Sequence, residues 1–152
     1  MEIFARNGDI VFISDKKEVV FNDTRVIIEG MVLDFPGEYE KSGFLAQIVE
    51  NKEKLFFQVR IEDKNVAYIP YDEIEITEEL GDLFGNINIL VIKGSKNSIK
   101  IYENLEVQYV VPYGDQKDIF FSTLGQHPEA VKSYKVKELA NDNEIVFINI
   151  EG

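Results

Sequence analysis

Short apolar runs separated by turn-forming residues dominate the first seventy positions of the chain. Each run is rich in β-branched and aromatic residues, and the separators contain Gly, Asn, Asp and Lys, a pattern typical of antiparallel strands joined by tight turns. The first three runs predict a meander over residues 1–22. The runs expected to be strands are 1–4, 9–13, 18–21, 24–30, 31–35, 42–50, 53–62 and 66–71, with 24–35 forming either one bent strand or two.

A helical pattern begins after residue 76. Thr77 is a candidate N-cap, and Leu80, Leu83 and Phe84 fall on one helical face, so a short helix is predicted over residues 78–84.

Apolar strands and short helices are expected to alternate in the rest of the chain. The runs 87–92 and 107–114 are almost wholly apolar, as in strands buried on both faces. The other expected elements are a short helix within 97–105, a helix over 116–125 that Gly125 closes, and a terminal hairpin of 133–139 and 143–150. This order predicts one α/β (α+β) domain, residues 1–152, of stacked sheets with helices outside and a β-rich N-terminal half.

Composition narrows the classes of function. With 152 residues and 45% hydrophobic content the chain can bury one core, and its net charge of −12 disfavours nucleic-acid binding. The absence of cysteine excludes disulfides and thiol catalysis, and the single histidine, His127, excludes a histidine-rich zinc site within one chain. Neither a signal-peptide pattern nor a membrane-length apolar run is present, so we expect a soluble cytoplasmic protein.

The stretch Phe35-Pro36-Gly37-Glu38 has the composition of a sharp corner between strands. Proline fixes φ and glycine permits a positive φ, which together suit a reversal of the chain. We interpret Pro36, Gly37 and Tyr39 as structural, with Tyr39 packed against the neighbouring sheet.

Four segments together resemble the metallo-β-lactamase-fold hydrolases, specifically the small zinc-dependent branch similar to L-ascorbate-6-phosphate lactonases. Residues 36–43, "PGEYEKSG", resemble the corner of that branch, and 1–23 resemble its opening strands. Residues 66–92 resemble the segment in which a strand ends at a metal-ligating Asp, and 105–114 the strand that ends in Pro-x-His. The resemblance implies a layered β-sandwich with outer helices.

The residues that carry this family's chemistry are missing from the sequence. The family binds two metal ions through His-x-His-x-Asp-His, and that motif is absent here. Only about a dozen residues separate Asp23 from the corner, so the segment that would carry the motif is expected to be deleted. The Pro-x-His position reads Pro112-Tyr113-Gly114, and Asp72 alone matches a ligand position. We therefore assign no catalytic residue, metal ligand or cofactor.

Two sets of polar residues remain as candidates for chemistry. Tyr71, Asp72, Tyr113 and Asp115 would lie near the vestigial site. An acidic set is either a solvated strand edge and helix start or a divalent-cation site; its members are Asp72, Glu73, Glu75, Glu78, Glu79 and Asp82.

The leading hypothesis is a catalytically inactive relative of the fold that acts as a binding or assembly module. Its partner would be a second copy, an active paralogue, or a small ligand in the vestigial cleft. Deletion of the metal segment is expected to leave an open sheet edge near residues 24–35 and 43–50. The alternatives are a hydrolase that uses carboxylates such as Asp72 without zinc, and a structural protein without a ligand.

Overall fold

The N-terminal part of the chain folds into a sheet of consecutive antiparallel strands. The computed structural model describes residues 1–137 and 144–152. The first five strands are β1 (Glu2–Arg6), β2 (Asp9–Ser14), β3 (Lys17–Asn22), β4 (Arg25–Ile28) and β5 (Met31–Leu33). Each pairs with the next, which confirms the meander over residues 1–22 and shows that residues 24–35 form two strands.

Two-residue turns join most of these strands and fix their register. Asn7 and Gly8, between β1 and β2, have φ angles of 56° and 85°, and Asp15 and Lys16, between β2 and β3, have 50° and 65°. Two successive positive φ angles are the mark of a type I′ turn, whose twist matches that of the strands it connects.

The second sheet begins antiparallel and ends parallel. Its strands in chain order are β6 (Gly37–Lys41), β7 (Phe44–Asn51), β8 (Lys54–Ile61), β9 (Lys64–Ile69), β10 (Ile89–Lys93), β11 (Tyr109–Tyr113) and β14 (Val146–Phe147). Strands β6 to β9 are hairpin-connected, whereas β9, β10, β11 and β14 run parallel. Parallel neighbours need crossover connections, and helices lie in those between β9 and β10 and between β10 and β11.

Three short helices lie where the sequence predicted helices. They are α1 (Glu78–Leu83), α2 (Ile99–Glu103) and α3 (Lys117–Thr123). The Thr77 hydroxyl accepts a hydrogen bond from the Leu80 amide at 3.3 Å, which caps α1. Gly125, with a φ of 70°, follows the end of α3.

The predicted terminal hairpin is wrong. Strand β13 (Ser133–Lys135) pairs with β1 in the first sheet, whereas β14 pairs with β11 in the second. Strands β12 (Ala130–Val131) and β15 (Asn149–Ile150) form a separate parallel pair. Both β1 and β11 offered an unpaired edge, and each edge takes one of the two segments instead of leaving them to pair together. Residues 138–143 of the predicted hairpin lie outside the described residues.

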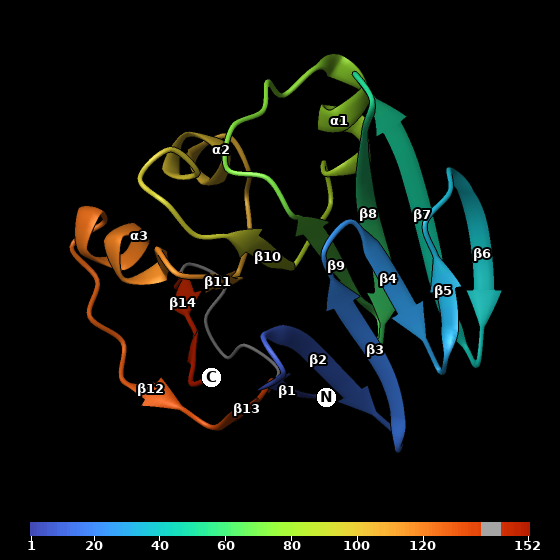
Figure 1. The fold of residues 1–152 in the computed structure, drawn as a ribbon, viewed down its shortest axis with the longest axis horizontal. Coiled ribbons are helices and arrows are strands. Elements are labelled where there is room, and N and C mark those ends of the chain that lie inside the picture. The colour runs from blue at the N-terminus through green and yellow to red at the C-terminus, as the bar shows by residue number, and fades with distance from the viewer. Residues whose placement is uncertain (138–143) are drawn as a thin grey trace.

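Two apolar cores hold the layers together. The larger core lies between the two sheets and includes Phe12, Phe21, Phe57 and Tyr68. The smaller lies between the second sheet and the helices, with Leu80 and Phe120 among others. In Figure 1, α1 lies beside β7 and β8, and α2 and α3 lie beside β10 and β11, all on the side of the second sheet away from the first. The predicted α+β layered sandwich is therefore confirmed, with its helices on one face.

The predicted corner is the place where the chain leaves the first sheet for the second. Strand β5 is an edge of the first sheet and β6 is an edge of the second. Tyr39 packs against the core between the sheets, and its hydroxyl donates to the Phe35 carbonyl at 2.7 Å. Strand β7 lies between β6 and β8, so the expectation of an open edge at residues 43–50 is wrong.

Replacing Gly37 with alanine should lower the free energy of unfolding by about 1 to 2 kcal/mol. Gly37 has a φ of 151°, and an added Cβ would lie 3.2 Å from the Tyr39 hydroxyl. Urea denaturation measures the change. Gly81→Ala in α1 is the matched control, because it has no positive φ and no atom within 4 Å of the added Cβ; equal effects of the two substitutions would contradict a structural corner.

Candidate functional site

The four residues proposed from the sequence lie at the carboxyl ends of two parallel strands of the second sheet. Tyr71 and Asp72 follow β9, while Tyr113 ends β11 and Asp115 follows it. Strand β10 lies between β9 and β11. Tyr71 and Asp72 therefore follow one strand, and Tyr113 and Asp115 end or follow another, with the two strands about 10 Å apart. Carboxyl ends of parallel strands are common ligand sites, so these four residues lie where this kind of sheet commonly binds a ligand.

Tyrosine side chains fill the space behind these strand ends. Tyr68 is almost fully buried, and its ring centroid lies 5.1 Å from that of Phe21 and 5.6 Å from that of Phe57. The Tyr113 ring follows at 6.0 Å, and its hydroxyl donates to the Tyr68 hydroxyl at 3.4 Å. The rings of Phe21, Phe57, Tyr68 and Tyr113 pack together between the two sheets and fill the space there; this cluster is called the aromatic plug.

A tight turn of the first sheet closes over the aromatic plug. The Tyr68 hydroxyl donates to the carbonyl oxygen of Asp23 at 2.6 Å. Asp23 lies in the two-residue turn between β3 and β4, at the start of the stretch from which, by the resemblance, the metal-binding segment is expected to be missing. Tyr68 and the Asp23 carbonyl were not among the sequence candidates. The available signal was a tyrosine in the otherwise apolar run 66–69.

Tyr71 is held by the neighbouring hairpin. Its hydroxyl accepts a hydrogen bond from the Leu55 amide at 3.0 Å, and its ring lies 5.3 Å from the Phe56 ring. The Lys54 ammonium lies 5.7 Å from the ring centroid. Burial raises the pKa of the Tyr71 hydroxyl, so this phenol stays neutral and acts as an anchor for β8.

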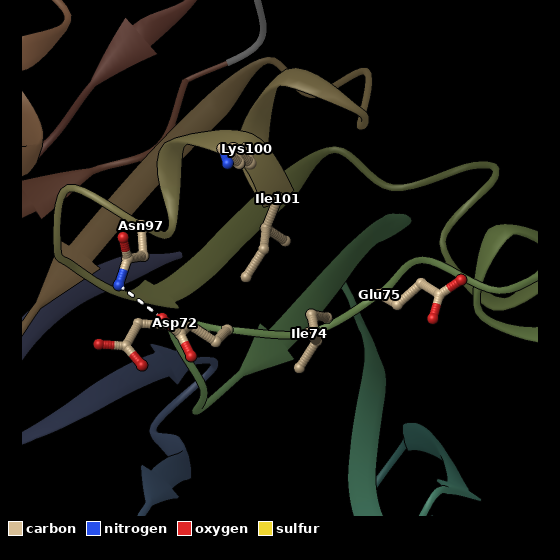
Figure 2. Close-up of a pocket in the computed structure, with 7 residues that line it drawn as sticks. Asp72, Ile74, Glu75, Asn97, Lys100 and Ile101 are labelled. Carbon is tan, nitrogen blue, oxygen red and sulfur yellow. Dashed lines mark hydrogen bonds between the residues drawn. The ribbon is translucent and has the colours of Figure 1, made fainter.

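Asp72 lines a surface pocket of about 400 Å³ between the segment after β9 and α2. Figure 2 shows Asp72 and Glu75 at opposite ends of this pocket. Across it, the Asn97 amide donates to the Glu73 carboxylate at 2.8 Å. Ile74 and Ile101 supply the apolar lining, and Lys100 the one cation. The carboxylates therefore do not converge as a paired acid and base would.

The side chains at the carboxyl ends of β9 and β11 do not provide the ligands that a catalytic pair of zinc ions needs. Within residues 1–137 and 144–152, no three His, Cys, Asp or Glu side chains gather so that they could hold a metal ion. Glu75 pairs with Lys52 at 3.0 Å, and Glu79 accepts from the Asn51 amide at 3.1 Å. The acidic set thus forms separate surface contacts, while Asp115 and His127 are exposed loop residues.

Raising the pH should destabilise the protein through the buried phenols. Burial raises the pKa of Tyr113 to about 12, against an ordinary value of about 10. The stability contributed by the neutral Tyr113 phenol is therefore fully present below about pH 10 and is lost as the pH rises to about 12. Tyr68, whose pKa burial raises further, adds to this loss.

The urea midpoint, followed between neutral and strongly alkaline pH, measures the effect, with phenolate absorbance as a second signal. Tyr113→Phe should reduce the steepness of the decline. An identical pH dependence in Tyr113→Phe would contradict the assignment, because the substitution removes only the phenol hydroxyl of Tyr113.

Comparison with known proteins establishes the fold alone. No protein-family model matches the chain, and no curated protein matches it. A crystal structure from Thermotoga maritima, described as a proposed zinc-dependent hydrolase of the metallo-β-lactamase superfamily, superposes with a TM-score of 0.73 and 15% sequence identity. The match covers 99% of this chain and 100% of that one. No helix in the described part of the chain is long and apolar enough to cross a bilayer. The two sheets, their strand order and this full-length match identify the fold of the chain as that of the metallo-β-lactamase superfamily.

Proposed function

We propose that this protein is a catalytically inactive relative of the metallo-β-lactamase-fold hydrolases and acts as a binding or assembly module. The observation that carries the proposal is the closure of the edge where the resemblance places the metal site. There the Asp23 carbonyl of the β3–β4 turn accepts a hydrogen bond from the Tyr68 hydroxyl at 2.6 Å. Pro112-Tyr113-Gly114 stands where the resemblance expects Pro-x-His, so Gly114 takes the position of the histidine. An origin in the L-ascorbate-6-phosphate lactonase-like branch rests on the corner motif of residues 36–43.

A hydrolase that uses carboxylates without zinc is the second candidate. The pocket beside α2 favours it, because Asp72 shares that pocket with the Asn97 amide and the Lys100 ammonium. A carboxylate, an amide and a cation can together orient a small anionic or polar substrate. Against it, Asp72 and Glu75 lie at opposite ends of the pocket (Figure 2), and the Glu73 carboxylate is bonded to Asn97.

The purified protein should retain well below one zinc ion per chain after dialysis against trace zinc. The reason is the donor set: one exposed histidine, no cysteine and scattered carboxylates. Elemental analysis measures the zinc content. About one tightly held zinc per chain would contradict the inactive assignment.

Hydrolysis assays separate the two candidates. Lactone, phosphodiester and β-lactam substrates cover the bonds to test. If the protein is an inactive relative, no substrate should be hydrolysed faster than in buffer alone. A turnover that disappears in Asp72→Asn, while the urea midpoint stays unchanged, would establish the second candidate.

A further inference from the structure

The outer face of the first sheet carries a continuous row of apolar side chains. Phe4 of β1 faces Val11 of β2, which faces Val20 of β3, and the row continues through Ile27 of β4 to Val32 of β5. Their neighbours along each strand point into the sandwich, so this row points outward. An antiparallel sheet with one face in water normally alternates apolar and polar residues, with the polar ones outside.

No helix of the described chain covers this row. All three helices pack on the second sheet (Figure 1). Val11 is nevertheless fully buried, because the Arg6 guanidinium of β1 and the Glu18 carboxylate of β3 form two hydrogen bonds of 2.8 Å across β2. The side chains of the row are more exposed at the edge strand β5, where Val32 is 47% exposed.

Charged residues flank the row on both sides. The strand register places three carboxylates and one ammonium on one flank, and two guanidiniums and two carboxylates on the other. The first flank contains Lys135, Glu2, Ile13, Glu18 and Glu29, and the second contains Arg6, Asp9, Asn22, Arg25 and Asp34. On the second flank Asp9 is already occupied by the Asn22 amide, at 2.7 Å.

We propose that this face pairs with the same face of a second copy, about a two-fold axis parallel to the apolar row. The inference rests on the proposed assembly function and names its surface and partner. A rotation about this axis lays each strand over its counterpart and each flank over the opposite flank. Glu29 then faces Arg25 of the second copy, which is the contact that carries the orientation. Glu2 faces Arg6 of the second copy, whose guanidinium is already bonded to Glu18 of its own chain. A two-fold axis along the strands would instead bring the two Glu18 carboxylates together at the centre.

The size of the face predicts a weak dimer. Five strands about 4.8 Å apart and roughly 17 Å long cover about 400 Å² per copy. That is below the roughly 800 Å² per partner of a standard interface. Each chain also carries a net charge of −12. We therefore expect association at micromolar or higher concentration that depends on the interfacial charge pairs.

Sedimentation velocity of the full chain, from micromolar to millimolar concentration, tests the dimer. Ile27→Glu should weaken it at least about tenfold. Leu45→Glu is the matched control: Leu45 lies on β7 of the second sheet and is 51% exposed, so its substitution should leave the dimer unchanged. Circular dichroism confirms that each variant is folded.

A charge-swap experiment tests the orientation. Arg25→Glu alone and Glu29→Arg alone should each abolish most self-association, because like charges then face each other twice. An equimolar mixture of the two variants should restore a heterodimer to near wild-type affinity, since both contacts become complementary again.

A strictly monomeric wild type at millimolar concentration would overturn the proposal, and so would a dimer that Ile27→Glu leaves intact. A mixture that fails to associate would overturn the stated axis. A zinc-free monomer would contradict this interface and leave the inactive assignment standing. A dimer that holds about one zinc per chain would support the interface and contradict the inactive assignment.

Discussion

Replacing Tyr68 with alanine should lower the free energy of unfolding by about 3 to 5 kcal/mol. The Tyr68 ring lies between the sheets in contact with Phe21, Phe57 and Tyr113, so its removal opens a cavity that backbone pairing on both sides prevents from collapsing. The substitution also leaves the Asp23 carbonyl without its hydrogen-bond donor. Urea denaturation followed by circular dichroism measures the loss.

Tyr68→Phe is the control that separates the ring from its hydroxyl. It keeps the ring and loses two hydrogen bonds, the one donated to the Asp23 carbonyl and the one accepted from the Tyr113 hydroxyl, so it should cost about 1 to 2 kcal/mol. If Tyr68→Ala cost no more than Tyr68→Phe, the ring would not be part of the aromatic plug between the sheets.

Replacing Gly94 with alanine should destabilise the protein by about 1 to 3 kcal/mol. Gly94 follows β10, and an added Cβ would lie 2.8 Å from the Lys117 Cα and 3.2 Å from the Pro112 Cβ. Lys117 is the first residue of α3, and its ammonium is bonded to the Ile150 carbonyl. The helix start therefore has to shift to make room.

Thermal and urea unfolding measure this change. Gly81→Ala again serves as the reference, because the same methyl group is added there without a contact. A Gly94→Ala protein as stable as Gly81→Ala would mean that α3 is free to move away from β10.

The strands could be predicted from local sequence, but the pairing of strands far apart in the chain could not. Apolar runs separated by short polar turns indicated strands β1 to β5 and β7 to β9, because the residues that form each hairpin are neighbours in sequence. Strand β6 was missed, because its polar sequence was interpreted as part of the corner. The terminal strands have two or three residues each. Their partners depend on which sheet edges are free, and only the assembled sheets decide that.

The candidate site was predictable in part. The spacing after β9 and β11 was enough to nominate Tyr71, Asp72, Tyr113 and Asp115, because parallel strands end at a common edge. The role of Tyr68 depends on the β3–β4 turn lying above it, a contact 45 residues apart in sequence. The outward row of the first sheet required the register of five strands, since alternation alone does not say which face is inside.

The tight turns bear on how quickly the chain folds. Strands β1 to β5 and β6 to β9 each pair with their neighbours in sequence, so loop closure costs little entropy while the two meanders form. Pairing of β13 with β1 instead joins residues more than 120 positions apart. Contacts of such high contact order form slowly. We therefore expect closure of the sandwich by its C-terminal strands, and not formation of the hairpins, to set the folding rate.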